Sequence, residues 1–201
     1  MKLVIGVAIC IFIFFGIINI ADWMIIGFAI PTRKRHYKKE YMIKNKNRMD
    51  FQKSSECSGF SFAYILRSVG READGNDMYA QMPGKFKNGA VMPKNLKKLV
   101  QMYGFKVTYV KGSLESLKAE LCEGNRVIVL IKTRADRAWL HYVPIVGYDE
   151  DNVFIAESLE YLVNCQETYY NRSLAHCEFL KLWDTRMPYM PLYKNTYLII
   201  E

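Results

Sequence analysis

The hydrophobic and polar positions divide the chain into three parts. Residues 3–30 are almost entirely apolar, with one charged residue at Asp22, and such a run is long enough for a membrane-spanning helix with some tilt. A polar, basic stretch without apolar periodicity follows, and regular apolar spacing resumes only near residue 50. The pattern therefore predicts a transmembrane anchor over residues 1–31, a basic juxtamembrane tether over 32–49 and a folded domain over 50–201.

The folded domain opens with a helix that starts at a cysteine. A polar loop leads into Cys57, apolar residues then recur at helical spacing, and Gly70 ends the pattern. A thiol at a helix N-terminus lies beside unpaired backbone N–H groups and the positive end of the helix dipole, which favour the nucleophilic thiolate. The alternative is an inert core thiol, because free cysteines are among the most buried side chains.

Beyond this helix, the patterns predict further helices first and strands second. Helical spacing occurs over residues 93–104 and 113–124. From residue 126 onward, short apolar or alternating runs separated by polar turns predict strands, with one late helix from Ser173. The predicted strands cover residues 105–110, 127–131, 139–148, 153–156, 168–170 and 197–200. This order indicates an α+β fold, with N-terminal helices packed on an antiparallel sheet.

The net charge of +8 changes this picture little, because the excess of basic residues is concentrated outside the domain. The tether holds a dense cluster from Arg33 to Lys39, whereas acidic and basic residues nearly balance over residues 50–201. A basic cluster next to an apolar helix favours contact with anionic lipid headgroups. The domain carries no recognised nucleic-acid-binding motif, so we expect no nucleic-acid partner.

The five cysteines do not indicate a metal site, since no two of them form a CxxC pair. They are Cys10, Cys57, Cys122, Cys165 and Cys177. An odd count leaves at least one thiol unpaired within the chain. Cys165 and Cys177 could form a disulfide in an exported domain, and their spacing alone does not decide this.

One histidine lies within a predicted strand hairpin and completes a possible catalytic group. Alternation places the ring of His141 on the opposite face from Leu140 and Tyr142. The hairpin returns to Glu157, which can place a carboxylate beside the imidazole. In such a group the imidazole keeps the thiol ionised and the acid orients the ring. A strand histidine is by itself more often structural, so the combination with Cys57 is what indicates a site.

Several segments of the domain, in their order along the chain, carry a family resemblance. They are Gln52-x4-Cys57 with its helix, the strand His141-Tyr-Val-Pro-Ile-Val-Gly-Tyr-Asp149, a second strand ending in Glu157, Tyr170-Asn-Arg172, Glu178-Phe-Leu-Lys-Leu-Trp183 and Asn195-Thr-Tyr-Leu-Ile-Ile200. Over residues 50–201 this arrangement resembles the bacteriocin-processing (double-glycine leader) peptidase-like family of papain-fold cysteine peptidases.

The resemblance implies a papain-like fold and a cysteine peptidase that acts on a peptide or protein substrate without a cofactor or metal. It implies that Cys57 is the nucleophile, His141 the general base and acid, and Glu157 the orienting acid. Gln52 and the Cys57 backbone N–H would form the oxyanion hole, and the reaction would pass through a thioester. Two alternatives on the same fold stay open: a catalytically inactive peptide-binding module and a related acyl-transfer enzyme.

The sequence departs from the family pattern at three places around these residues. Ser58 follows the cysteine where glycine is usual, and Glu56 precedes it where aspartate or asparagine is usual. Glu157-Ser158 stands where Asp-Pro is common. The longer glutamate reaches the histidine only if the end of its strand shifts, and an inward-pointing Glu56 would oppose thiolate formation by its charge.

Localisation follows from the apolar run and the basic cluster. The run is too long for a typical signal-peptide core and has no clear cleavage site, which favours a retained single-pass anchor over a cleaved signal sequence. The basic cluster after the run places the domain in the cytoplasm by the positive-inside rule, whereas the family resemblance favours an exported domain. We predict a cell-membrane protein, lean toward the cytoplasmic side and leave the side open.

Overall fold

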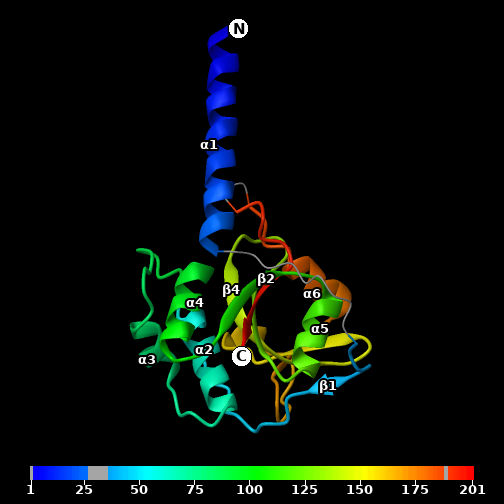
Figure 1. The fold of residues 1–201 in the computed structure, drawn as a ribbon. Coiled ribbons are helices and arrows are strands. Elements are labelled where there is room, and N and C mark those ends of the chain that lie inside the picture. Colours follow the sequence, from blue (N-terminus) through cyan, green and yellow to red (C-terminus); the bar gives the residue numbers. More distant parts are fainter. Residues whose placement is uncertain (1, 27–35, 188–189) are drawn as a thin grey trace.

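The structure, a computed structural model, describes residues 2–26, 36–187 and 190–201. It consists of an N-terminal helix, α1 (Lys2–Ile26), and a folded α+β unit, from which α1 extends (Figure 1). The described residues of the folded unit begin at His36 and end at Glu201.

A seven-stranded antiparallel sheet forms the centre of the folded unit. Its strands are β1 (Tyr41–Met42), β2 (Val107–Lys111), β3 (Arg126–Lys132), β4 (Leu140–Tyr148), β5 (Asn152–Ile155), β6 (Arg172–Ala175) and β7 (Thr196–Ile200). The strand order is β2-β7-β3-β4-β5-β6, and β1 pairs with the far end of β4. The central strand β3 is fully buried over Val127 to Ile131, as its continuous apolar run predicts.

Helices cover this sheet on both sides. They are α2 (Cys57–Ser68), α3 (Gly75–Ala80), α4 (Pro93–Met102), α5 (Leu114–Cys122) and α6 (His176–Leu182), with a short 3-10 helix at Glu160–Leu162. Figure 1 shows α2, α3 and α4 together on one side of the strands, and α5 and α6 on the other. The α+β class with an antiparallel sheet, predicted from the sequence, is therefore confirmed.

The helix that carries the cysteine is the most deeply packed helix of the fold. All residues of α2 are buried except Cys57 and Arg67 at its two ends, and it packs against α3 and β4. Glycine allows the close approach of α3, because a Cβ atom at Gly59 would collide with the Gly75 carbonyl oxygen. The packing of α2 against α3 and β4 therefore positions the thiol at its first residue.

One strand and one helix boundary differ from the sequence prediction. The strand expected at residues 168–170 lies instead at β6, and α6 begins at His176 rather than at Ser173. In β6, Arg172 pairs with Ile155 of β5, so an arginine enters the buried part of the sheet. An apolar pattern cannot reveal such a strand, because its buried end is occupied by a charged side chain.

The predicted membrane-spanning helix is not supported by the structure. Within residues 2–26 and the other described ranges, we find no helix that is both long enough and apolar enough to span a bilayer. The prediction covered residues 3–30, whose last four residues lie outside the described ranges, as does the start of the predicted tether. Lipid contact and localisation are not tested by the structure and stay predictions.

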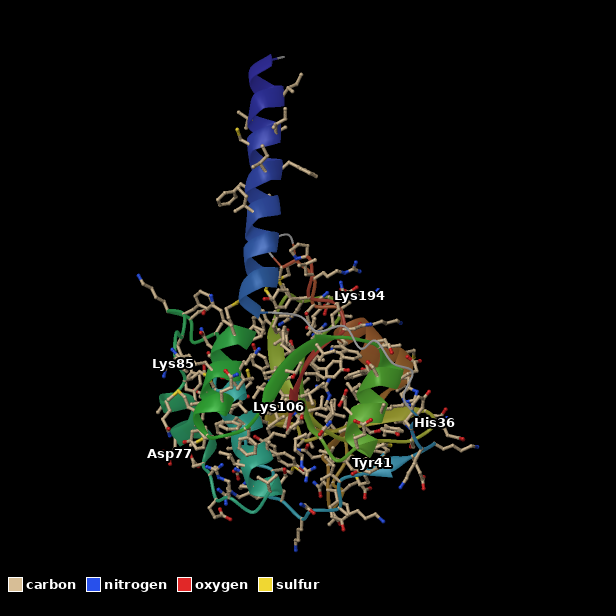
Figure 2. The ribbon with its side chains drawn as sticks, in the orientation of Figure 1. His36, Tyr41, Asp77, Lys85, Lys106 and Lys194 are labelled. Carbon is tan, nitrogen blue, oxygen red and sulfur yellow. The ribbon has the colours of Figure 1, made fainter. Side chains whose placement is uncertain are left out.

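Charged side chains are spread around the folded unit. Lys85, Lys106 and Lys194 are all exposed, and Figure 2 shows them on well-separated parts of the surface. This distribution agrees with the near balance of charge in residues 50–201.

The folded unit begins earlier than the hydrophobic pattern indicates. Tyr41 and Met42 pair with β4, and Ile43 is only 6% exposed. The side-chain amides of Asn45 and Asn47 then donate to the backbone carbonyls of Ser68 and Tyr64, at 2.6 and 2.9 Å. Part of the stretch predicted as a tether therefore fastens the C-terminal half of α2, through hydrogen bonds that have no hydrophobic signature.

We expect a chain that begins at Asp50 to be less stable than one that begins at His36. The deletion exposes the pocket filled by Ile43, a loss of about 1.5–3 kcal/mol, and two hydrogen bonds, worth about 1 kcal/mol each. Urea unfolding of both chains measures the difference. Gly147→Ala in the full chain is the matched point variant, because its methyl group would collide with the Tyr41 carbonyl oxygen and displace β1. Two results would contradict this boundary: equal midpoints for the chains that begin at Asp50 and at His36, and equal midpoints for Gly147→Ala and the unsubstituted full chain.

Candidate active site

Cys57 is the first residue of α2 and is half-buried. Its backbone N–H has no acceptor within the helix, since the first turn of any helix leaves its N–H groups unpaired. The preceding residue, Glu56, makes no side-chain cap to the helix, and its carboxylate accepts a hydrogen bond from the Ser54 backbone N–H at 2.7 Å. The thiol thus lies at the positive end of α2, as the sequence predicts.

His141 and Glu157 form a buried pair beside this thiol. His141 lies on β4 and is 1% exposed, and Glu157 follows β5 and is also 1% exposed. Nε2 of the ring lies 2.6 Å from Glu157 Oε1, which leaves Nδ1 as the ring nitrogen available to Cys57. The pairing of β4 with β5 shifts register between Ile145 and Gly147, which lies between the β4–β5 turn and the His141–Glu157 contact. The longer glutamate side chain therefore reaches the histidine in this fold.

The electrostatics of the pair favour a protonated ring beside an ionised acid. Burial by itself lowers the pKa of His141, but the charge of Glu157 and hydrogen bonds with Cys57 and Glu157 raise that pKa to about 9. Burial by itself raises the pKa of Glu157, but His141 and Arg172 outweigh it and lower that pKa to about 2. At neutral pH the site therefore holds an imidazolium and a carboxylate, and a neighbouring imidazolium stabilises a thiolate.

Two residues that the sequence analysis did not assign to the site hold Glu157 in place. Arg172 Nη1 donates to Glu157 Oε2 at 2.8 Å, and both side chains are buried. The Asn171 side chain accepts from the Glu157 backbone N–H at 2.6 Å and donates to its carbonyl oxygen at 2.9 Å. The Leu159 backbone N–H binds Oε1, the oxygen that faces His141, at 2.8 Å. The sequence identified Asn171-Arg172 as part of a family motif, but it did not identify Glu157 as the residue that this dipeptide binds.

Gln52 lies on the loop that precedes α2 and lines the same cleft as Cys57. Its backbone N–H donates to the Ser158 carbonyl oxygen at 2.9 Å, and its Oε1 accepts from the Ser158 hydroxyl at 2.7 Å. Its Nε2 donates to the Ser54 carbonyl oxygen. The structure thus places Gln52, Cys57 and His141 on the wall of one cleft, with Glu157 behind the histidine.

This cleft has a volume of about 790 Å³ and a mostly apolar lining. The lining comes from the loop before α2, residues 86–93, the turn between β3 and β4, and residues 159–161. Three aromatic side chains at its border, Phe86, Trp139 and Tyr161, are 53–67% exposed. Exposed aromatic side chains beside a nucleophile offer apolar contacts to a bound chain.

The described residues show no cluster of three or more His, Cys, Asp or Glu side chains that could hold a metal ion. All five cysteines are free thiols. The disulfide that the sequence left open between Cys165 and Cys177 is therefore not formed in this structure.

Comparisons with known proteins agree with this fold. The model of the Peptidase C39-like family matches residues 39–187, whereas no curated protein matches the chain. A C39-like peptidase from Bacillus anthracis is 13% identical, with a TM-score of 0.60 over 82% of this chain and 98% of that one. The peptidase domain of Streptococcus ComA, a bifunctional ABC transporter, is 10% identical, with a TM-score of 0.57 over 78% and 98%. A double-glycine-motif protease from an AMS/PCAT transporter, solved with its leader peptide, is 17% identical, with a TM-score of 0.54 over 84% and 94%. At these identities the solved structures show a shared fold.

Proposed function

Because the chain belongs to the C39-like peptidase family, as its sequence motifs predicted, we propose that it is a cysteine peptidase that uses Cys57, His141 and Glu157. The observation that carries the proposal is the buried contact between His141 and Glu157, next to a thiol at a helix N-terminus. A general base must keep one orientation and must become positively charged during the reaction. A carboxylate fixed by a buried arginine serves both requirements, whereas a purely structural histidine requires neither.

In this mechanism the residues act in two half-reactions. The Cys57 thiolate attacks the carbonyl carbon of a peptide bond, and the carbonyl oxygen becomes an oxyanion that accepts hydrogen bonds from the Cys57 backbone N–H and Gln52 Nε2. His141 then donates its proton to the leaving amine, and a thioester remains on Cys57. Water, deprotonated by His141, attacks the thioester and releases the acid product and the thiolate. Glu157 keeps the ring oriented and stabilises its positive charge throughout.

The substrate class that fits the cleft is a peptide or protein segment with apolar side chains. The lining carries few charged groups, and the exposed aromatic residues at the border extend the apolar surface away from the thiol. A relative of the same fold was solved with a leader peptide, which supports a peptide as the occupant.

The reactivity of Cys57 across pH tests the proposal. At pH 6 a small haloacetamide should alkylate Cys57 faster than an ordinary free thiol, which is mostly protonated there, and His141→Ala should slow this alkylation. Cys122, Cys165 and Cys177 are internal controls in the same sample, and desolvation together with the charge of Glu167 raises the pKa of Cys165. If Cys57 reacts no faster than these thiols at pH 6, with no dependence on His141, the site is not catalytic and a peptide-binding module takes its place.

A further inference from the structure

We propose that Ser158 is a positioning residue that holds the Gln52 amide in the orientation an oxyanion donor needs, an inference that rests on the proposed peptidase function. Ser158 is 7% exposed and directly follows the acid Glu157. Its hydroxyl donates to Gln52 Oε1 at 2.7 Å, and its carbonyl oxygen accepts from the Gln52 backbone N–H at 2.9 Å. Two hydrogen bonds therefore join the loop before α2 to the segment that carries the acid.

The orientation of the amide matters because its two ends have opposite chemistry. An Nε2 end directed at the oxyanion stabilises it, whereas an Oε1 end directed there repels it. The Ser54 carbonyl oxygen can only accept, so it selects the Nε2 end, and the Ser158 hydroxyl then donates to Oε1 at the other end. Held at both ends, the amide keeps its second Nε2 hydrogen for the oxyanion.

The neighbouring position of Ser158 and Glu157 links the two halves of the site. The Glu157 side chain holds the His141 ring, and the next residue holds Gln52. One dipeptide thus sets the general base and the oxyanion donor relative to each other. Loss of the hydroxyl should disturb the donor without disturbing the base, because the contacts of Glu157 with His141 and Arg172 do not involve Ser158.

The test compares Ser158→Ala with three matched variants in the full chain, using hydrolysis of a fluorogenic peptide. Removing an oxyanion donor costs roughly 10²-fold in kcat or more, so we expect that loss in Gln52→Ala and a loss of roughly 3- to 30-fold in Ser158→Ala, with KM almost unchanged. Ser158→Thr keeps the hydroxyl and should recover most of the loss. Ser68→Ala removes a buried hydroxyl at the other end of α2 and should leave kcat unchanged.

Two outcomes would overturn the inference. In the first, Ser158→Ala lowers kcat by the same factor in the Gln52→Ala background as in the wild type, which would show that the hydroxyl does not act through Gln52. In the second, Ser158→Ala slows the alkylation of Cys57 at pH 6, which would place its effect on the histidine and the acid. The inference is supported if the kcat of the Gln52→Ala/Ser158→Ala double variant is no lower than that of Gln52→Ala and if Ser158→Ala leaves the alkylation rate of Cys57 unchanged.

A readout that needs no turnover separates this inference from the proposed function. The side-chain amide signals of Gln52 in ¹⁵N NMR spectra should shift and broaden in Ser158→Ala and stay unchanged in Ser68→Ala. If the wild type cleaves no peptide, the proposed function fails, and these signals alone decide whether Ser158 holds the amide. Unchanged signals in Ser158→Ala would reject the inference even in an active enzyme.

Discussion

Replacing Cys57 with alanine should abolish peptide-bond hydrolysis, with a loss of roughly 10⁴-fold or more in kcat because the nucleophile is removed. The variant should stay folded, since the side chain is only half-buried and contributes little to the core. Cys57→Ser is the second variant. It replaces the thiol with a hydroxyl of similar size, which is not ionised at neutral pH. Hydrolysis of a peptide reporter, followed to the detection limit, measures the effect.

Cys122→Ala is the matched control for this loss. Cys122 is also half-buried, and its sulfur lies 3.0 Å from the Tyr148 hydroxyl, outside the cleft. We expect its removal to leave kcat unchanged. Hydrolysis that persists in purified Cys57→Ala would reject the assigned nucleophile, and equal peptide affinity of an inactive wild type and Cys57→Ala would identify a binding module.

The sequence could predict the chemical groups of the site because each of them has a local signature. The helix that starts at Cys57 follows from apolar spacing after a polar loop, and the placement of His141 follows from alternation in a strand. The prediction of Glu157 required only that the next strand return to the end of the sheet where His141 lies. In the structure, Glu157 Oε1 lies 2.6 Å from His141 Nε2. Local periodicity and short connections therefore sufficed to bring these three residues together, whereas their catalytic roles rest on the family resemblance and stay predictions.

The supports of the site could not be predicted, because they come from distant segments and polar contacts. Arg172 is 15 residues from Glu157 in the sequence and reaches it only through the pairing of β5 with β6. Ser158 and Gln52 are separated by 106 residues. Hydrogen bonds between such residues leave no periodic pattern, so only a family motif or a structure reveals them.

Breaking the buried ion pair of Glu157 and Arg172 should have the largest effect on stability. Both side chains are almost completely buried, and removal of Arg172 leaves the buried Glu157 carboxylate paired with His141 but without its arginine. Arg172→Leu should therefore lower the free energy of unfolding by about 3–5 kcal/mol. Arg134→Leu is the matched control, because its pair with Asp136 has a similar distance but is more than half exposed, and such surface pairs contribute little to stability.

The pH dependence of unfolding should report the same groups. The pKa of Glu157 is lowered from 4.5 to about 2, so its contribution to stability is present above pH 4.5 and is lost as pH falls through about 2. The pKa of His141 is raised from 6.5 to about 9, so its contribution is present below pH 6.5 and is lost as pH rises through about 9. In Arg172→Leu the acid loss should be smaller and should be complete at a higher pH, because one of the charges that lowers the pKa of folded-state Glu157 is gone.

A double variant separates stability from catalysis at this pair. Glu157→Gln combined with Arg172→Leu removes both charges, so it should regain much of the stability lost in Arg172→Leu alone. It should not regain rapid alkylation of Cys57 at pH 6, because no carboxylate then stabilises the protonated ring of His141 beside the thiolate. If the double variant is as unstable as Arg172→Leu, lost packing rather than an uncompensated charge explains the destabilisation. If it alkylates as fast as the wild type, then Glu157 does not set the charge of the histidine.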